Sequence, residues 1–276
     1  MKFAKYHGLG NDYLVINQQD LSFKLTSEKI KLICHRNFGI GSDGILLGSF
    51  DDGLFSVRIF NPDGSEAEKS GNGLRIFSRY LWDRGLVGDK SFSIQTLGGL
   101  VNALVLDRGH TIQVEMGKVS FWGEYITVVG IGREVINEEI EISDKIFNFC
   151  AATIGNPHCV INLDEVDEIS PQIAQKYGYK IENHPLFPNR TNVQFMKVIN
   201  RNCIHIEIWE RGAGYTLASG SSSCAAASVA YKLGFCDSNI TVSMAGGLMN
   251  IQVSPDFSIL MTGEVTKVAE GIMFWE

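Results

Sequence analysis

The chain repeats its own sequence, and this internal duplication constrains the fold more than any other feature. Residues 10–17 (GNDYLVIN) resemble residues 155–162 (GNPHCVIN) at an offset of 145 positions. Further matches follow in the same order at offsets of 148 or 149 positions: residues 57–60 with 206–209, Ser70-Gly71 with Ser219-Gly220, Gly85 with Gly234, and residues 96–102 with 244–250. Such segments look alike in many glycine-rich proteins, but the constant order and the nearly constant offset favour two homologous halves. A length of 276 residues also suits two domains.

Both halves predict the same mixture of strands and one helix. In each half, a Gly-Asn turn leads into an apolar strand, and an alternating strand leads through a polar loop into a helix. We expect these helices at residues 73–84 and 224–233, ended by Gly85 and Gly234 as C-cap glycines. Another strand, a Gly-Gly-Leu turn and a last strand complete each half, which predicts an α/β fold.

The composition excludes several classes of protein. Charged residues make up 20% and hydrophobic residues 45%, which predicts a folded globular chain. The net charge is −7 and no dense basic run occurs, so we expect no nucleic-acid partner. Apolar runs such as residues 103–106 are far shorter than the roughly 20 residues of a membrane helix, and residues 1–8 lack a secretory signal. Six cysteines without a C-x-x-C pair predict reduced thiols in the cytoplasm and no metal site.

Two polar, glycine-containing segments each precede an expected helix, at residues 61–73 and 210–223. Free N–H groups at a helix N-terminus favour a carboxylate or phosphate, so these segments predict anion binding near Ser70 and Ser219. The alternative is that both serines are only N-caps, and the local sequence favours this alternative. No dinucleotide fingerprint or P-loop occurs, and we expect no nucleotide cofactor.

His158 and the pair Glu210-Arg211 lie at the ends of expected strands, a frequent position for active-site residues. Taken singly, His158 fits a turn residue and Glu210-Arg211 fits a surface ion pair equally well. The residues alone leave both interpretations open.

Taken together, the motifs resemble those of the diaminopimelate epimerase family over nearly the whole chain. The segments that carry the resemblance are residues 7–12, 36–44, 61–75, 155–160, 192–193 and 209–227. The resemblance implies two pseudo-symmetric domains, each a mixed sheet wrapped around a central helix, with the substrate in the cleft between them. It also implies an isomerase that interconverts LL- and meso-diaminopimelate, a precursor of lysine and peptidoglycan, by two-base proton transfer without pyridoxal phosphate.

On this basis we expect an N-terminal domain at residues 1–115 with a C-terminal strand at 264–276, and a second domain at 116–263. The expected partner is a small amino acid, with diaminopimelate as the substrate that the resemblance implies. No cofactor, metal, membrane or nucleic acid is expected, and a homodimer is compatible with the resemblance.

The chain departs from the family at the two positions that carry the chemistry. The family's catalytic cysteines, one in each domain, correspond to Ser70 and Ser219. A thiol ionises readily, whereas a serine hydroxyl needs an adjacent base. Cys159 and Cys224 match non-catalytic positions. Three explanations stay open: an engineered Cys-to-Ser trap for substrate, a natural variant in which His158 and Glu210 assist the serines, or a binding protein that lost the reaction.

The other pocket residues that the resemblance implies can be assigned to positions in this chain. We expect Ser70, Ser219, His158 and Glu210 as catalytic residues, and the substrate-binding residues to be Asn11, Asn61, Gly71, Asn72, Asn156, Asn192, Glu210, Arg211, Gly220 and Ser221. The resemblance places Gly71, Asn72, Gly220 and Ser221 at helix N-termini that bind the α-carboxylate, where they would stabilise the carbanion. Tyr215 and Ser222 stand where the family often has Glu and Gly, which leaves open a racemase of another amino acid such as histidine.

Overall fold

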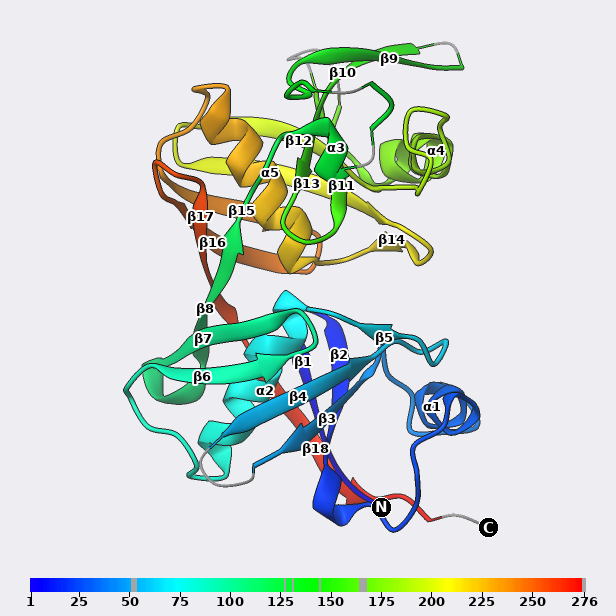
Figure 1. Cartoon of the computed structure of the whole chain (residues 1–276), viewed down its shortest axis with the longest axis vertical. Coiled ribbons are helices and arrows are strands. Elements are labelled where there is room, and N and C mark those ends of the chain that lie inside the picture. Colours follow the sequence, from blue (N-terminus) through cyan, green and yellow to red (C-terminus); the bar gives the residue numbers. More distant parts are fainter. Residues whose placement is uncertain (51–53, 127, 131, 144, 164–167, 275–276) are drawn as a thin grey trace. The chain divides into compact units, whose positions relative to one another are not determined.

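The computed structural model describes residues 1–50, 54–126, 128–130, 132–143, 145–163 and 168–274. The chain forms two compact units, Met1–Glu115 with Thr262–Glu276, and Met116–Met261. It passes from the first unit to the second within β8 (Thr111–Lys118) and returns within β17 (Ser258–Glu264) (Figure 1).

Strands surround one long helix in the first unit. The elements are β1 (Lys2–Gly8), β2 (Asn11–Asn17), α1 (Ser27–Cys34), β3 (Ile45–Ser49), β4 (Phe55–Phe60), β5 (Glu66–Ala67), α2 (Gly71–Asp83), β6 (Phe92–Thr96), β7 (Gly99–Leu106) and β18 (Thr266–Ile272), with short 3-10 helices at Gln18–Asp20 and Asp107–Gly109. Helix α2 packs against β1, β2, β3 and β7. Its buried face carries Leu74, Ile76, Phe77 and Leu81, each fully inaccessible to solvent.

The second unit is built in the same way around α5. Its elements are α3 (Gly123–Ile126), β9 (Glu138–Ile142), β10 (Lys145–Thr153), β11 (Pro157–Asn162), α4 (Pro171–Glu182), β12 (Asn192–Asn200), β13 (Cys203–Glu210), β14 (Gly214–Thr216), α5 (Gly220–Lys232), β15 (Asn239–Met244) and β16 (Gly247–Val253). Helix α5 packs against β10, β11, β12, β13, β15 and β16. Its alanines at 225–227 are fully buried, because small side chains allow strands to approach closely.

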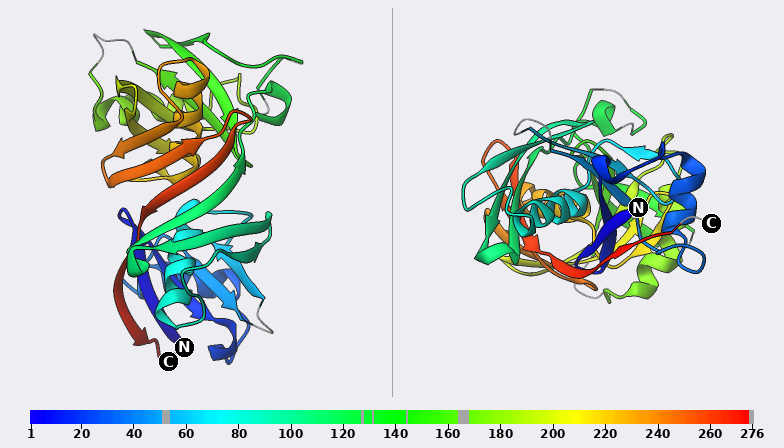
Figure 2. Two further views of the ribbon diagram at one scale, coloured as in Figure 1. Left: turned by 90° about the vertical axis from the view of Figure 1, so that its left-hand side faces the viewer. Right: turned by 90° about the horizontal axis from the view of Figure 1, so that it is seen from below.

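Strand pairing repeats between the units, which confirms the predicted duplication and the mixed α/β fold. The series β1, β2, β3, β4 pairs antiparallel, parallel, antiparallel, and the series β10, β11, β12, β13 does the same. Strands β4 and β13 each add a short antiparallel strand, β5 or β14, and a parallel one, β6 or β15. Figure 2 shows both central helices among their strands.

The two central helices also end alike, as the glycines predicted. Gly85 and Gly234 have φ angles of 68° and 74°, a conformation that glycine adopts without strain. The following N–H groups of Leu86 and Phe235 donate to the carbonyl groups of Leu81 and Ala230, which completes a Schellman motif at each end. Among the described residues, no helix is long and apolar enough to span a membrane.

Candidate active site

Ser70 is the N-cap residue of α2, and its hydroxyl is used as an acceptor. Its backbone is extended, with φ −140° and ψ 120°, and its Oγ accepts a hydrogen bond from Gly73 N at 3.1 Å. This contact satisfies one of the N–H groups that a helix N-terminus leaves without a helical partner. The Tyr13 hydroxyl lies 3.4 Å from the same Oγ.

Ser219 occupies the equivalent position before α5, but its hydroxyl points to a different partner. Its backbone angles, φ −143° and ψ 124°, match those of Ser70, yet its side chain makes no capping hydrogen bond. Instead Ser219 Oγ donates to Glu210 Oε2 at 3.4 Å, and the residue is only 4% exposed. The two serines therefore share a backbone position and differ in side-chain role, so the N-cap alternative describes Ser70 only.

A side-chain hydrogen bond links each helix start to the Gly-Asn turn of its own unit. In the first unit, Asn72 Nδ2 donates to Asn11 Oδ1 at 2.9 Å. In the second unit, Asn156 Nδ2 donates to Ser221 Oγ at 3.3 Å. Asn72 and Ser221 are the second residues of α2 and α5, so each unit bonds its turn to the same helix position, with the donor on the helix in the first unit and on the turn in the second. Gly71 and Gly220, the first helical residues, are buried beside these bridges.

Hairpins brace the segments that lead into both serines. The amide of Gly98 donates to the Glu68 carbonyl at 2.9 Å, and the amide of Gly246 donates to the Leu217 carbonyl at 2.8 Å. In each unit the accepting residue lies two positions before the serine. The Gly-Gly-Leu turns recognised in the sequence therefore help to fix the direction from which the chain enters each helix.

A cluster of charged side chains holds Asn11 through a hydrogen bond to Asp43. Asp43 Oδ2 accepts hydrogen bonds from Asn11 Nδ2 and from the Asp12 amide, both at 3.0 Å. Arg36 bridges Asp12 at 2.9 Å and Asp43 at 2.7 Å, and Lys5 pairs with Asp12 at 2.7 Å. Burial would raise the pKa of Asp12, but the hydrogen bonds from Arg36 and Lys5 outweigh it and lower that pKa. Burial and the neighbouring Asp12 raise the pKa of Asp43.

His158 lies on β11 and is completely buried. Its Nε2 lies 3.0 Å from Asn156 Oδ1, so the ring orients the amide that bonds to Ser221. Burial lowers the pKa of His158 to about 3; a contact with Gln194 opposes this shift, and the charge of Arg211 adds to it. The imidazole is therefore neutral near pH 7. This geometry suits a role in positioning Asn156 better than the exchange of protons with solvent.

Asn192 joins the two loops of the second half-site. Its Nδ2 donates to the Pro157 carbonyl at 2.8 Å, and its Oδ1 accepts from the Arg211 amide at 3.0 Å. The loop is further held by Glu182, which is 3% exposed and accepts from the Trp209 indole at 2.8 Å and the Gly212 amide at 2.9 Å. These contacts fix the backbone beside Glu210.

Three other expected or altered positions have local partners. Asn61 Nδ2 donates to Ser65 Oγ at 3.0 Å within its own exposed turn. The exposed guanidinium of Arg211 donates to the Asn189 carbonyl at 3.2 Å. The Tyr215 hydroxyl donates to the buried carboxylate of Glu207 at 2.8 Å, and burial together with this bond raises the pKa of Tyr215 to about 12. Because this hydroxyl is used inside its own unit, Tyr215 gives no support to a different amino-acid substrate.

The described structure therefore gathers the expected residues into one group per unit. Asn11, Ser70, Gly71 and Asn72 lie together in the first, and Asn156, His158, Asn192, Glu210, Arg211, Ser219, Gly220 and Ser221 in the second. Asn61 lies in a separate turn, where its side chain bonds to Ser65. The sequence did not indicate Tyr13, Asp43 or Glu182 as supporting residues, although Asp43 lies in a segment that carries the family resemblance.

Among the described residues, no cluster of three His, Cys, Asp or Glu side chains is arranged to hold a metal ion.

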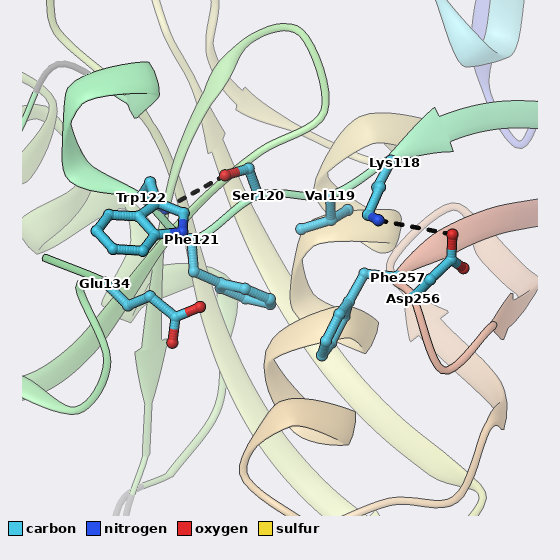
Figure 3. Close-up of a pocket in the computed structure, with 8 residues that line it drawn as sticks. All are labelled: Lys118, Val119, Ser120, Phe121, Trp122, Glu134, Asp256 and Phe257. Atoms are coloured by element: carbon cyan, nitrogen blue, oxygen red, sulfur yellow. Dashed lines mark hydrogen bonds and ion pairs between the residues drawn. The ribbon is translucent and has the colours of Figure 1, made fainter.

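A separate pocket of about 490 Å³ lies elsewhere in the second unit (Figure 3). Its walls include Phe121 and Phe257, whose rings pack edge to face with their centroids 5.1 Å apart. Its charged side chains are paired, with Lys118 3.6 Å from Asp256 and Glu134 2.8 Å from Lys232. None of the expected site residues lines this pocket, so the half-sites above remain the candidates for chemistry.

Comparisons with known proteins find similar sequences over nearly the whole chain. The sequence model described as Diaminopimelate epimerase matches residues 3–122 and 150–268. The chain is 67% identical over 273 residues to "Diaminopimelate epimerase 2" of Nostoc sp., covering 98% of this chain and 95% of that protein. It is 38% identical over 279 residues to "Diaminopimelate epimerase" of Moorella thermoacetica, covering 98% of each.

Solved structures share the fold at low sequence identity. A hydroxyproline epimerase from Agrobacterium vitis aligns with a TM-score of 0.73 at 13% identity, covering 98% of this chain and 91% of that one. A predicted epimerase from Pseudomonas aeruginosa aligns with a TM-score of 0.71 at 12% identity, covering 100% and 99%. At such identities the likeness concerns the fold alone.

Proposed function

The chain belongs to the diaminopimelate epimerase family, and we propose that it interconverts LL- and meso-diaminopimelate without a cofactor. One observation carries the proposal: each unit presents a serine at the start of its central helix, with an Asn bridge beside it. An epimerase that works from both faces of a carbon needs one proton-transfer group for each face. Each half-site supplies one of these groups.

We assign binding of the substrate α-carboxylate to the N-termini of α2 and α5. The first N–H groups of a helix have no acceptor within the helix, and the helix dipole favours a negative charge there. Removal of the α-proton shifts negative charge toward the carboxylate. These donors would therefore stabilise the carbanion more strongly than the substrate, which is the condition for catalysis.

Proton removal is assigned to Ser219 together with Glu210. A serine hydroxyl is too weak a base alone, and the carboxylate 3.4 Å away supplies the missing acceptor. The α-proton passes to Ser219 Oγ while the hydroxyl proton passes to Glu210, and the C–H electron pair stays on the substrate as a carbanion. Ser70 then gives its hydroxyl proton to the opposite face of that carbon. Catalytic hydrogen bonds are often long before substrate binds, so 3.4 Å is compatible with this role.

The other expected residues keep supporting parts in the proposal. His158 holds Asn156, and Asn192 holds the backbone beside Glu210. We assign Asn61 and Arg211, whose side chains lie in exposed segments, to the distal amino-acid end of the substrate. We also propose that the protein acts in the cytoplasm and that its substrate is a small molecule. That it forms a homodimer stays a prediction.

The test is exchange of the α-proton of LL-diaminopimelate in deuterated buffer, followed by NMR together with formation of the meso isomer. This chain is compared with its Ser70→Cys/Ser219→Cys double variant. Exchange and isomerisation by this chain support the proposal. Exchange by the double variant alone would refute serine catalysis and favour a protein that binds diaminopimelate without turnover. Exchange by neither would refute diaminopimelate as the substrate.

A binding protein is the second candidate, because both reacting positions carry hydroxyls where the family resemblance implies thiols. It predicts saturable binding of a diaminopimelate isomer in a calorimetric titration, with no exchange. Absence of binding for every isomer would remove this candidate.

A further inference from the structure

Tyr13 lies where it can control the Ser70 hydroxyl. It is on β2, is 6% exposed, and brings its hydroxyl to 3.4 Å from Ser70 Oγ across 57 positions of sequence. Gly44 makes room for the Tyr13 ring: a Cβ at this position would lie 2.5 Å from Tyr13 Cε1 and 2.5 Å from the Phe60 carbonyl oxygen. Any larger residue at 44 would require the Tyr13 ring or the Phe60 backbone to shift.

The partners of the two serines differ in what they can do with a proton. In the role proposed for it, the Glu210 carboxylate beside Ser219 only accepts hydrogen bonds. The phenol beside Ser70 can also donate. Ser70 Oγ already accepts the Gly73 N–H, and a second hydrogen bond donated by Tyr13 would fill its remaining acceptor position. The Ser70 O–H is then directed away from both partners and is available to a substrate.

We propose that Tyr13 is a positioning residue that directs and replenishes the proton donated by Ser70. The inference rests on the proposed function. In the step, the Ser70 O–H bond breaks and its proton forms a C–H bond with the electron pair of the substrate carbanion. The Tyr13 O–H bond breaks at the same time, and its proton passes to Ser70 Oγ. The negative charge comes to rest on the Tyr13 phenolate, which takes a proton from water and leaves hydroxide. Glu210 returns the proton that it accepted from Ser219 to the solvent, where it neutralises that hydroxide.

This arrangement is favourable because a phenol is a stronger acid than an aliphatic hydroxyl. A Tyr side chain has an ordinary pKa of about 10, so its phenolate is a much better resting place for the charge than a serine alkoxide. Without the phenol, Ser70 would have to end the step as an alkoxide. The inference therefore predicts that the loss of Tyr13 slows proton return while proton removal by Ser219 continues.

The experiment compares two rates in deuterated buffer with LL-diaminopimelate: α-proton exchange in recovered substrate and formation of the meso isomer. Tyr13→Phe removes only the hydroxyl. We expect formation of meso product to fall by about tenfold, less than the 10²–10⁴ typical of a direct acid or base, while exchange in recovered substrate continues. The ratio of exchange to inversion rises. A purely structural role would lower both rates together and leave this ratio unchanged.

Tyr6→Phe is the matched control, since Tyr6 is buried in the same unit and its hydroxyl donates to Asp83 at 2.8 Å. It should keep the parent ratio. Tyr13→Phe in the Ser70→Cys background should have a smaller effect, because a thiol donates its proton without help. An active parent whose Tyr13→Phe variant keeps the parent ratio overturns the inference alone. A parent with neither exchange nor inversion overturns the proposed function, and the role of Tyr13 with it.

Discussion

Replacing His158 should remove a defined part of the acid sensitivity of the fold. The ring is fully buried, and burial lowers the pKa of His158 from 6.5 to about 3. Above pH 6.5 the ring is neutral in both folded and unfolded chains, and stability is unaffected. Between pH 6.5 and about 3, the unfolded chain binds a proton that the folded chain does not. Stability therefore falls as the pH falls, by about 1.4 kcal/mol per pH unit.

The expected loss between about pH 7 and pH 5 is about 2 kcal/mol from this one residue. For a domain of this size, that free energy corresponds to a decrease in Tm of about 4–8 °C. The variant is His158→Gln, whose side-chain N–H can still reach Asn156. Unfolding in urea is measured at both pH values, and the difference between them is the readout. The variant should lose about 2 kcal/mol less than the parent, whatever its absolute stability.

His110→Gln is the matched control, because His110 is exposed. This variant removes a histidine without removing the burial that is expected to cause the effect. An NMR titration of the His158 ring gives an independent check, since no protonation is expected between about pH 8 and pH 5. A ring that titrates between pH 6 and pH 7, or a variant with the parent's pH dependence, would refute the assignment of a buried neutral imidazole. Either result would restore His158 as a candidate acid–base group.

Two further predictions use other contacts of the half-sites. Ser70→Ala removes the cap on Gly73 N and should lower the free energy of unfolding by about 1 kcal/mol, whereas Ser219→Ala removes no cap and should cost less. Urea unfolding checks this, and equal losses would contradict the difference in side-chain role. Glu182→Met removes both oxygens that accept from the Trp209 indole and the Gly212 amide and should cost about 1–3 kcal/mol. Hydrogen exchange at the Gly212 amide should become faster than in the parent, and unchanged protection there would show that Glu182 does not hold the loop.

The duplication made most of the fold predictable from the sequence. The apolar spacing within each half, however, predicted helix starts that lie too far along the chain. Apolar spacing predicted helices from residues 73 and 224, whereas α2 and α5 begin at Gly71 and Gly220. The first turn of α5 consists of glycine and serines, which have low helix propensity. Burial of this turn against the surrounding strands outweighs the low helix propensity. Because the buried residues are glycine and serine, a pattern of apolar residues does not reveal this packing.

The partners of the site residues were the least predictable feature. Tyr13 and Ser70 are 57 positions apart, and only the packing of β2 beside α2 brings them together. Strand β11 is buried at four consecutive positions, so alternation along it could not show whether His158 faces solvent or core. The turn that holds the Asn61 side chain with Ser65 is local, but its residues allowed either a substrate contact or a structural role.

A duplicated site need not keep two equal halves, because the chemistry of a hydroxyl depends on the group beside it. Ser70 and Ser219 have nearly the same backbone angles and precede helices of equal length. One hydroxyl accepts from a helix amide beside a phenol, and the other donates to a carboxylate. A carboxylate partner favours taking a proton, and a phenol partner favours giving one. The repeated backbone thus fixes the positions of the two hydroxyls. The neighbouring side chains, Tyr13 beside Ser70 and Glu210 beside Ser219, determine whether each hydroxyl gives or takes a proton.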